Sequence, residues 1–170
     1  IKVNQIQDTS TNVAANISGG VVTFTNPPQG TGKVLQVVQN TSSTLATISD
    51  NTFVTTGFGQ AITPTSATSK LLLTVSVYIT IPSGGQGSIN IYSSADSALV
   101  TSATNGFGGP YGVMNGSSME SINTINFLTD AVGSTSSRTY TLYGKSTGTD
   151  PTYFLNGTRL STFTITEIGA

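Results

Sequence analysis

The strongest pattern of apolar and polar positions in the chain runs over residues 70–81. Large aliphatic side chains occupy every odd position of this segment, whereas hydroxyl-bearing side chains occupy four of its even positions. Successive side chains of a β-strand point to opposite faces of its sheet, so the alternation predicts a strand with one buried face. We therefore expect Val75 and Val77 to lie in the core and Thr74 to lie on the opposite face.

Shorter segments with the same alternation predict strands at intervals along the rest of the chain. The predicted strands cover residues 33–39, 52–56, 60–63, 87–93, 119–128, 138–145 and 160–168. Glycine and proline turns separate them, and no stretch shows helical periodicity apart from a short one at 94–99. Eight or so strands of this kind predict an all-β fold, an antiparallel β-sandwich of the jelly-roll type.

Two hairpins are expected within this sandwich. Residues 87–93 follow a Pro-Ser-Gly-Gly turn, so we expect them to pair back on residues 70–81. Asn156-Gly157 is the preferred two-residue type I′ turn, and it predicts a second hairpin between the segments on either side of it.

Two irregularities are also predicted. Residues 57–59 are expected to bend the chain between two short strands, and the apolar parity within residues 119–128 changes between Ile122 and Ile125, which predicts a β-bulge. Three strand tyrosines are expected on the faces turned away from the core: Tyr78, Tyr92 and Tyr143.

Residues 1–32 differ from the sandwich segment 33–170 and are predicted to form an extended N-terminal arm and linker. They contain short apolar runs but too few apolar residues for a core of their own, and residues 26–32 are rich in proline and glycine. We expect the arm to attach the protein to a partner by adding strands to an open sheet edge. Four apolar side chains are the predicted attachment residues: Val3, Ile6, Val21 and Phe24.

The composition excludes several functional classes. Charged residues make up 8% of the 170 residues, and 30 Thr and 22 Ser supply the polar surface instead. The six Lys and Arg residues are scattered, so no nucleic-acid-binding patch is expected. The absence of His and Cys excludes thiol catalysis, His-based triads, disulfides and zinc fingers. No apolar stretch reaches 18 residues, so we expect no membrane-spanning helix.

The carboxylates carry no recognisable catalytic or calcium-binding motif. Asp50, Asp130 and Asp150 stand beside Ser, Thr, Gly or Pro, where Asp commonly caps its own backbone. We therefore predict no catalytic residue, no metal site and no cofactor. A carbohydrate-active enzyme with a carboxylate pair assembled by the fold is the weakest of the functional hypotheses.

The longest predicted loop, residues 104–116, is rich in glycine and is a candidate recognition loop. Its aromatic rings have the character needed to stack on a sugar or to fill a subunit interface. The residues predicted to form this recognition surface are Phe107, Tyr111 and Asn115.

Short motifs follow one another in a definite order along nearly the whole chain. They are Ile-Lys-Val-Asn-Gln-Ile-Gln at 1–7, Gly-Lys-Val-Leu-Gln-Val-Val-Gln at 32–39, Phe-Val-x-Thr-Gly at 53–57, Ala-Ile-Thr-Pro at 61–64, Ser-Lys-Leu-Leu at 69–72, Ile-Asn-Phe-Leu-Thr-Asp at 125–130, Arg-Thr-Tyr-Thr at 138–141, Asn-Gly at 156–157 and Thr-Ile-Thr-Glu-Ile at 164–168. This order resembles the distal domains of tail fibres and related surface proteins of tailed phages, notably phages of marine bacteria and cyanobacteria.

The resemblance implies a non-enzymatic structural protein of the virion. It implies a homotrimer whose β-domain faces outward and contributes to host-surface attachment. The implied partners are further copies of the chain, other virion proteins of the capsid or tail, and a host surface glycan or protein. Tail fibres carry a longer attachment region than residues 1–32, so a capsid-decorating (cement) or head-fibre protein attached through these residues is the alternative.

Overall fold

The computed structural model describes residues 5–7, 13–18, 21–24, 32–83, 85–108, 118–155 and 157–169; before residue 32 the description covers the backbone alone. The described residues form β-strands and no helix, and hence no helix with the length and apolarity to cross a membrane. The strands are β1 (Gln5–Gln7), β2 (Val13–Ser18), β3 (Val21–Phe24), β4 (Val34–Ser42), β5 (Ala46–Ile48), β6 (Val54–Ile62), β7 (Lys70–Ile81), β8 (Gly87–Ser93), β9 (Ala98–Leu99), β10 (Met119–Leu128), β11 (Arg138–Ser146), β12 (Thr152–Phe154) and β13 (Ser161–Ile168).

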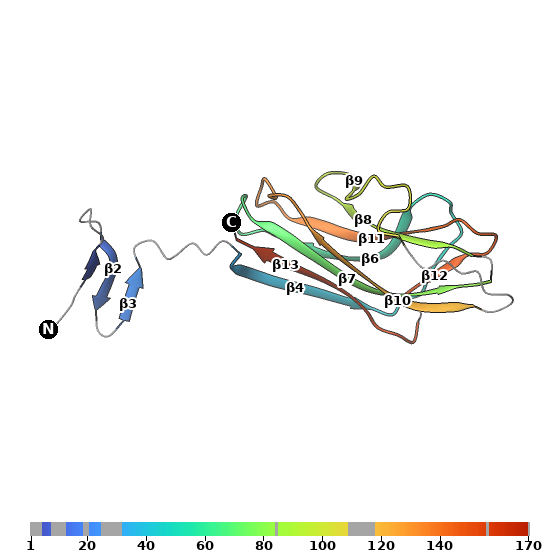
Figure 1. Ribbon diagram of the computed structural model, residues 1–170, viewed down its shortest axis with the longest axis horizontal. Helices are drawn as coiled ribbons and strands as arrows, with labels where there is room; N and C mark the ends of the chain where they lie inside the picture. Colours follow the sequence, from blue (N-terminus) through green and yellow to red (C-terminus); the bar gives the residue numbers. More distant parts are fainter. Residues whose placement is uncertain are drawn as a thin grey trace.

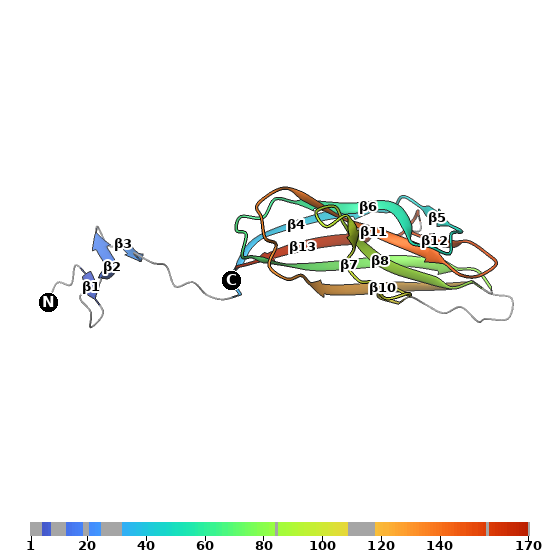
Figure 2. The same ribbon diagram turned by 90° about the horizontal axis from the view of Figure 1, so that it is seen from above.

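Two antiparallel sheets stack face to face as a β-sandwich (Figures 1 and 2). The first, called the β4 sheet here, contains β4, β13, β7 and β10 together with the short strands β5 and β12. The second, called the β6 sheet, has the order β6-β11-β8-β9. Every strand pair in both sheets is antiparallel.

The strand order is that of a jelly roll, which confirms the predicted fold class. Taken in chain order, the eight main strands are β4, β6, β7, β8, β9, β10, β11 and β13. The first pairs with the eighth, the second with the seventh, the third with the sixth and the fourth with the fifth. Two further pairings, β13 with β7 and β11 with β8, complete the two four-stranded layers.

The core lies between the two sheets and is built as the alternation predicts. Every odd residue of β7 from Leu71 to Ile81 is fully buried, including Val75 and Val77. Phe163 of β13 packs edge-on against Phe58 of β6, with ring centroids 6.0 Å apart, so this pair joins the two layers.

The predicted hairpin between β7 and β8 is wrong, because the two strands belong to different sheets. β8 pairs with β11 and β9, and the connection after β7 crosses from the β4 sheet to the β6 sheet. Ile89 and Ile91 face the core from the opposite layer. The alternation of β8 predicts that one face of the strand is buried, but it does not predict in which of the two sheets the strand lies.

The predicted hairpin at Asn156-Gly157 is also wrong. β12 and β13 both pair with the same edge of β7. They therefore lie end to end along that edge, one after the other, instead of pairing with each other. Phe154 and Phe163, one in each of these strands, are both fully buried. Leu155 adopts a positive φ of 59° and donates its N–H to the Tyr78 carbonyl at 2.9 Å, which turns the chain away from that edge there.

Three smaller expectations are corrected as well. β10 pairs with β7 without any shift in register, and Ile122 is simply an exposed residue rather than the mark of a bulge. β6 is one continuous strand; the bend at 57–59 is absorbed within it, with Gly57 at a φ of 76° and a register shift on the β11 side. Residues 94–99 form a turn and β9 instead of a helix.

The N-terminal strands β1, β2 and β3 form a separate three-stranded antiparallel sheet. β2 and β3 are antiparallel neighbours, with Ser18 opposite Val21. Within the described residues this sheet shares no strand pairing with the other two. Of the predicted attachment residues, Ile6 lies in β1 and Val21 and Phe24 lie in β3, whereas Val3 lies outside the described residues.

Candidate functional site

The predicted recognition loop is only partly described. Phe107 is half-buried: its ring packs edge-on against Phe127 of β10 with centroids 5.6 Å apart, and its N–H donates to the Ile89 carbonyl at 2.9 Å. The start of the loop is therefore held against β8 and the end of β10. Tyr111 and Asn115 lie outside the described residues.

The outer face of the β4 sheet carries two rows of four uncharged polar side chains across its four long strands, which we call the hydroxyl band. One row is Thr124, Ser76, Thr162 and Thr41; the other is Asn126, Thr74, Thr164 and Gln39. Neighbours in the band bond to one another: the Thr74 hydroxyl donates to Asn126 at 3.0 Å, and the Gln39 amide donates to Thr164 at 2.8 Å. The band is thus a polar surface without charge.

Exposed apolar side chains lie on both sides of the hydroxyl band. Among the described residues, every large hydrophobic side chain that is exposed belongs to β4, β10 or the loops that follow β4 and β12. They are Val34, Leu35, Val37, Leu45, Ile122, Leu128 and Leu160. Single exposed hydrophobics are normal, whereas a contiguous apolar patch larger than a few hundred Å² marks an interaction surface.

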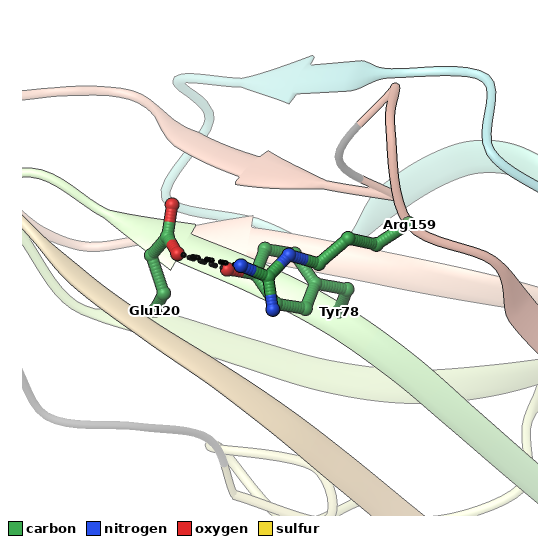
Figure 3. A network of polar contacts seen from close by, with 3 residues as sticks. All are labelled: Tyr78, Glu120 and Arg159. Atoms are coloured by element: carbon green, nitrogen blue, oxygen red, sulfur yellow. Dashed lines mark hydrogen bonds and ion pairs between the residues drawn. The ribbon is translucent and has the colours of Figure 1, made fainter.

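The charges next to the hydroxyl band cancel one another (Figure 3). The Tyr78 hydroxyl donates a short hydrogen bond to the Glu120 carboxylate, and the Arg159 guanidinium lies 3.5 Å from that carboxylate and 4.5 Å from the centre of the Tyr78 ring. Burial, together with the hydrogen bond to Glu120, raises the pKa of Tyr78 above its ordinary value of 10.0. Arg159 therefore pins the loop of residues 155–160 onto β7 and β10 and leaves the face without net charge there.

The three strand tyrosines do lie at positions turned away from the core, although in different surroundings. Tyr92 and Tyr143 stack on each other on the β6 sheet, with ring centroids 5.1 Å apart. Tyr78 is only 3% exposed, because Arg159 covers its ring. No sequence signal links Glu120 and Arg159 to Tyr78, since the residues are far apart along the chain.

Four of the described carboxylates lie in connections between strands: Asp50, Asp96, Asp130 and Asp150. Nowhere in the described ranges do three His, Cys, Asp or Glu residues come close enough to hold a metal ion. Asp96 accepts a hydrogen bond from the Ser93 hydroxyl at 2.6 Å, in the turn before β9. Asp50 contributes its main-chain carbonyl, which accepts the Ser146 N–H at 2.8 Å.

Comparison with known proteins finds distant structural similarity only. No protein-family profile matches the chain, and no curated protein sequence matches it. The VP2 subviral particle of infectious bursal disease virus is similar at 14% identity and a TM-score of 0.43, over 91% of this chain and 41% of that one. A chain in the structure of the Gx strain of the same virus is similar at 14% identity and a TM-score of 0.43, over 81% of this chain and 33% of that one. The chain spans less than half the length of these proteins. The jelly-roll fold is assigned from the strand order of this chain itself.

Proposed function

We propose that the chain is a structural protein of a tailed-phage virion, displayed on the particle surface as a homotrimer and contributing to host-surface attachment. Residues 1–32 join it to the particle, and the jelly roll of residues 33–170 is the displayed domain. The order of sequence motifs supports the virion role, and jelly rolls are common in viral capsid and lectin domains. The confinement of the exposed large hydrophobics to the β4 sheet is the observation that carries the assembly of several copies.

The chemistry of the β4 sheet suits contact with further copies of the same chain. In a cyclic trimer each copy contacts a different patch of its neighbour, and residues near the threefold axis meet their own copies. A surface without net charge opposes neither kind of contact, because it brings no like charges together. The hydroxyl band is uncharged, and the charges of Glu120 and Arg159 compensate each other. Burial of the aliphatic side chains around the band supplies the favourable free energy.

The oligomeric state tests this interface. Sedimentation at micromolar concentration should give a trimer for the wild-type chain and a monomer for Ile122→Asp. Ile122 is 66% exposed in the single chain, so the substitution should leave folding intact while placing a charge in the interface. Ala61→Asp, at an exposed position of the β6 sheet, is the matched control and should remain trimeric. A monomeric wild type, or an Ile122→Asp variant that stays trimeric, contradicts the proposed interface.

Deletion of residues 1–24 tests the attachment role of the arm. The truncated chain should fold, because the sandwich has its own core, but it should no longer be found on purified particles by quantitative immunoblotting. Incorporation at normal occupancy would contradict attachment through the arm. Labelling of the full-length protein on intact particles distinguishes a tail fibre from the alternative, a capsid-decorating or head-fibre protein.

A further inference from the structure

A cavity of about 320 Å³ opens between the end of β10, the start of β11 and the turn around β9. This volume is at the lower end of the range for ligand pockets, roughly 300–1,000 Å³, which suits one small ring. Its polar lining includes Asp96, Asp130, Arg138 and Tyr140, and its apolar lining includes Phe127 and Val132.

Arg138 is the buried charge of this cavity and is incompletely paired. It is only 5% exposed; its Nη2 donates to the carbonyls of Val132 at 3.0 Å and Ser134 at 3.2 Å. Its Nε is buried and has no hydrogen-bond partner among the described residues, and no described carboxylate forms an ion pair with it. Arg138 thus contributes a mostly buried positive charge to the lining, held in place by the carbonyls of residues 132 and 134.

Beside the guanidinium lies a neutral phenol. Tyr140 is 2% exposed, and burial raises the pKa of its hydroxyl, an effect that the nearby Arg138 only partly opposes. The hydroxyl therefore remains protonated at neutral pH and is able both to donate and to accept a hydrogen bond. Polar groups of two kinds, one charged and one neutral, thus meet in the buried part of the lining.

Two exposed carboxylates complete the lining. Asp96 and Asp130 are both exposed and are provided by different connections, before β9 and after β10. Together with Arg138 they make the cavity net negative, which disfavours an anionic ligand. Carboxylates in this setting are acceptors for hydroxyl groups, and a charge-assisted hydrogen bond is stronger than one between neutral groups.

The apolar part of the lining is partly aromatic. Phe127 lines the cavity, and its ring packs edge-on against Phe107 of the predicted recognition loop. An aromatic and aliphatic wall next to several convergent hydrogen-bonding groups fits a ring that has an apolar C–H face and a hydroxylated rim.

We infer that this cavity binds a neutral monosaccharide unit, with its hydroxyl groups on the exposed carboxylates of Asp96 and Asp130 and its C–H face against Phe127. The inference rests on the attachment part of the proposed function and names its ligand class, a neutral sugar at the end of a host surface glycan. It is tested on the purified chain, so its failure is distinguishable from failure of particle location or trimer formation.

Ligand-observed NMR titration with glucose, galactose, mannose, N-acetylglucosamine, glucuronate and Ca²⁺ tests the site. At least one neutral sugar should bind in the millimolar range, and glucuronate should bind more weakly. Asp130→Asn should weaken the binding of that sugar about tenfold, because a hydrogen bond to a charged group is replaced by one to a neutral group. Asp150→Asn, at an exposed carboxylate outside the cavity lining, is the matched control and should bind like the wild type.

Three results would overturn the inference: no binding of any neutral sugar, preferential binding of glucuronate or of Ca²⁺ alone, or equal affinities for the Asp130→Asn and Asp150→Asn variants. Both substituted side chains are exposed, so the two variants are expected to fold, and this is checked by circular dichroism before the titration. Arg138 is left unchanged in these tests because its buried side chain also holds residues 132–134 in place.

Discussion

Val75→Asp should destabilise the sandwich by several kcal/mol and lower its melting temperature sharply. Val75 is fully buried in the middle of β7, between Phe163 on β13 and Ile125 on β10, and all three side chains belong to the core. An aspartate at this position would have no partner for its charge, which costs several kcal/mol. Since a domain of this size is stable by roughly 5–15 kcal/mol, one such substitution removes a large part of the total.

Thr74→Asp is the matched control for this prediction. Thr74 lies one residue away on the outer face, where its hydroxyl donates to Asn126, so the substitution loses one surface hydrogen bond. Its effect on the free energy of unfolding should be about 1 kcal/mol. Thermal unfolding followed by circular dichroism at low protein concentration separates folding from assembly. If the two variants melted at the same temperature, the assignment of a buried and an exposed face to β7 would be wrong.

Glu167→Ala should destabilise the fold by about 3 kcal/mol, because it removes the acceptor shared by two backbone N–H groups and two side-chain donors. Glu167 of β13 is completely buried. Its carboxylate accepts the Thr65 N–H at 2.8 Å, the Thr65 hydroxyl at 2.9 Å, the Ser66 N–H at 3.3 Å and the Gln36 amide at 2.6 Å. One side chain thereby ties together the last strand, the first strand of the sandwich and the connection between β6 and β7.

The same carboxylate should make stability depend on pH. Burial disfavours its charged form, but the hydrogen bonds from Gln36 and Thr65 outweigh that effect, so the pKa of Glu167 lies below its ordinary value of 4.5. The native state therefore binds this proton less readily than the unfolded state, and the charged group stabilises the fold above the unfolded pKa. That contribution is lost as the pH falls from about 4.5 through the lower native pKa.

Urea unfolding of the wild type and of Glu167→Gln between pH 3 and pH 7 measures this contribution. The difference in unfolding free energy between the two proteins should be constant near neutral pH and should shrink below about pH 4.5. Asp150→Asn, which removes an exposed carboxylate, should track the wild type across the range. A gap that stays constant down to pH 3 would show that the charge of Glu167 is unimportant.

The positions of most of the long strands, and the faces that β7 and β13 bury, follow from the sequence alone, whereas the short strands β5, β9 and β12 are not predicted by it. The alternation in β7 and β13 predicts which side chains reach the core, and Val75, Val77, Phe163 and Ile165 are all buried there. This works because the two-residue period of a strand is a local property, and burial of one face imposes it on each strand separately. The jelly-roll class follows in the same way from the number and spacing of such segments.

The pairing of the strands is not a local property, and here the folded chain departs from the prediction. The alternation of β8 is satisfied from either layer of the sandwich. Asn156-Gly157 predicts a hairpin, but β12 and β13 pair with β7 instead of with each other. Phe154 and Phe163 both reach the core only when β12 and β13 continue along the same edge of β7. Packing of large apolar side chains outweighs the preference of a two-residue turn.

The polar sites depend most strongly on the three-dimensional arrangement. Glu167 resembles any other carboxylate in the sequence until the fold places Thr65, Ser66 and Gln36 around it, and Asp96, Asp130 and Arg138 line one cavity although they are separated along the chain. A carboxylate or guanidinium acquires its role from the groups that surround it and from its removal from water. Those surroundings are created by contacts between distant segments, whereas the strand pattern is already complete within each segment.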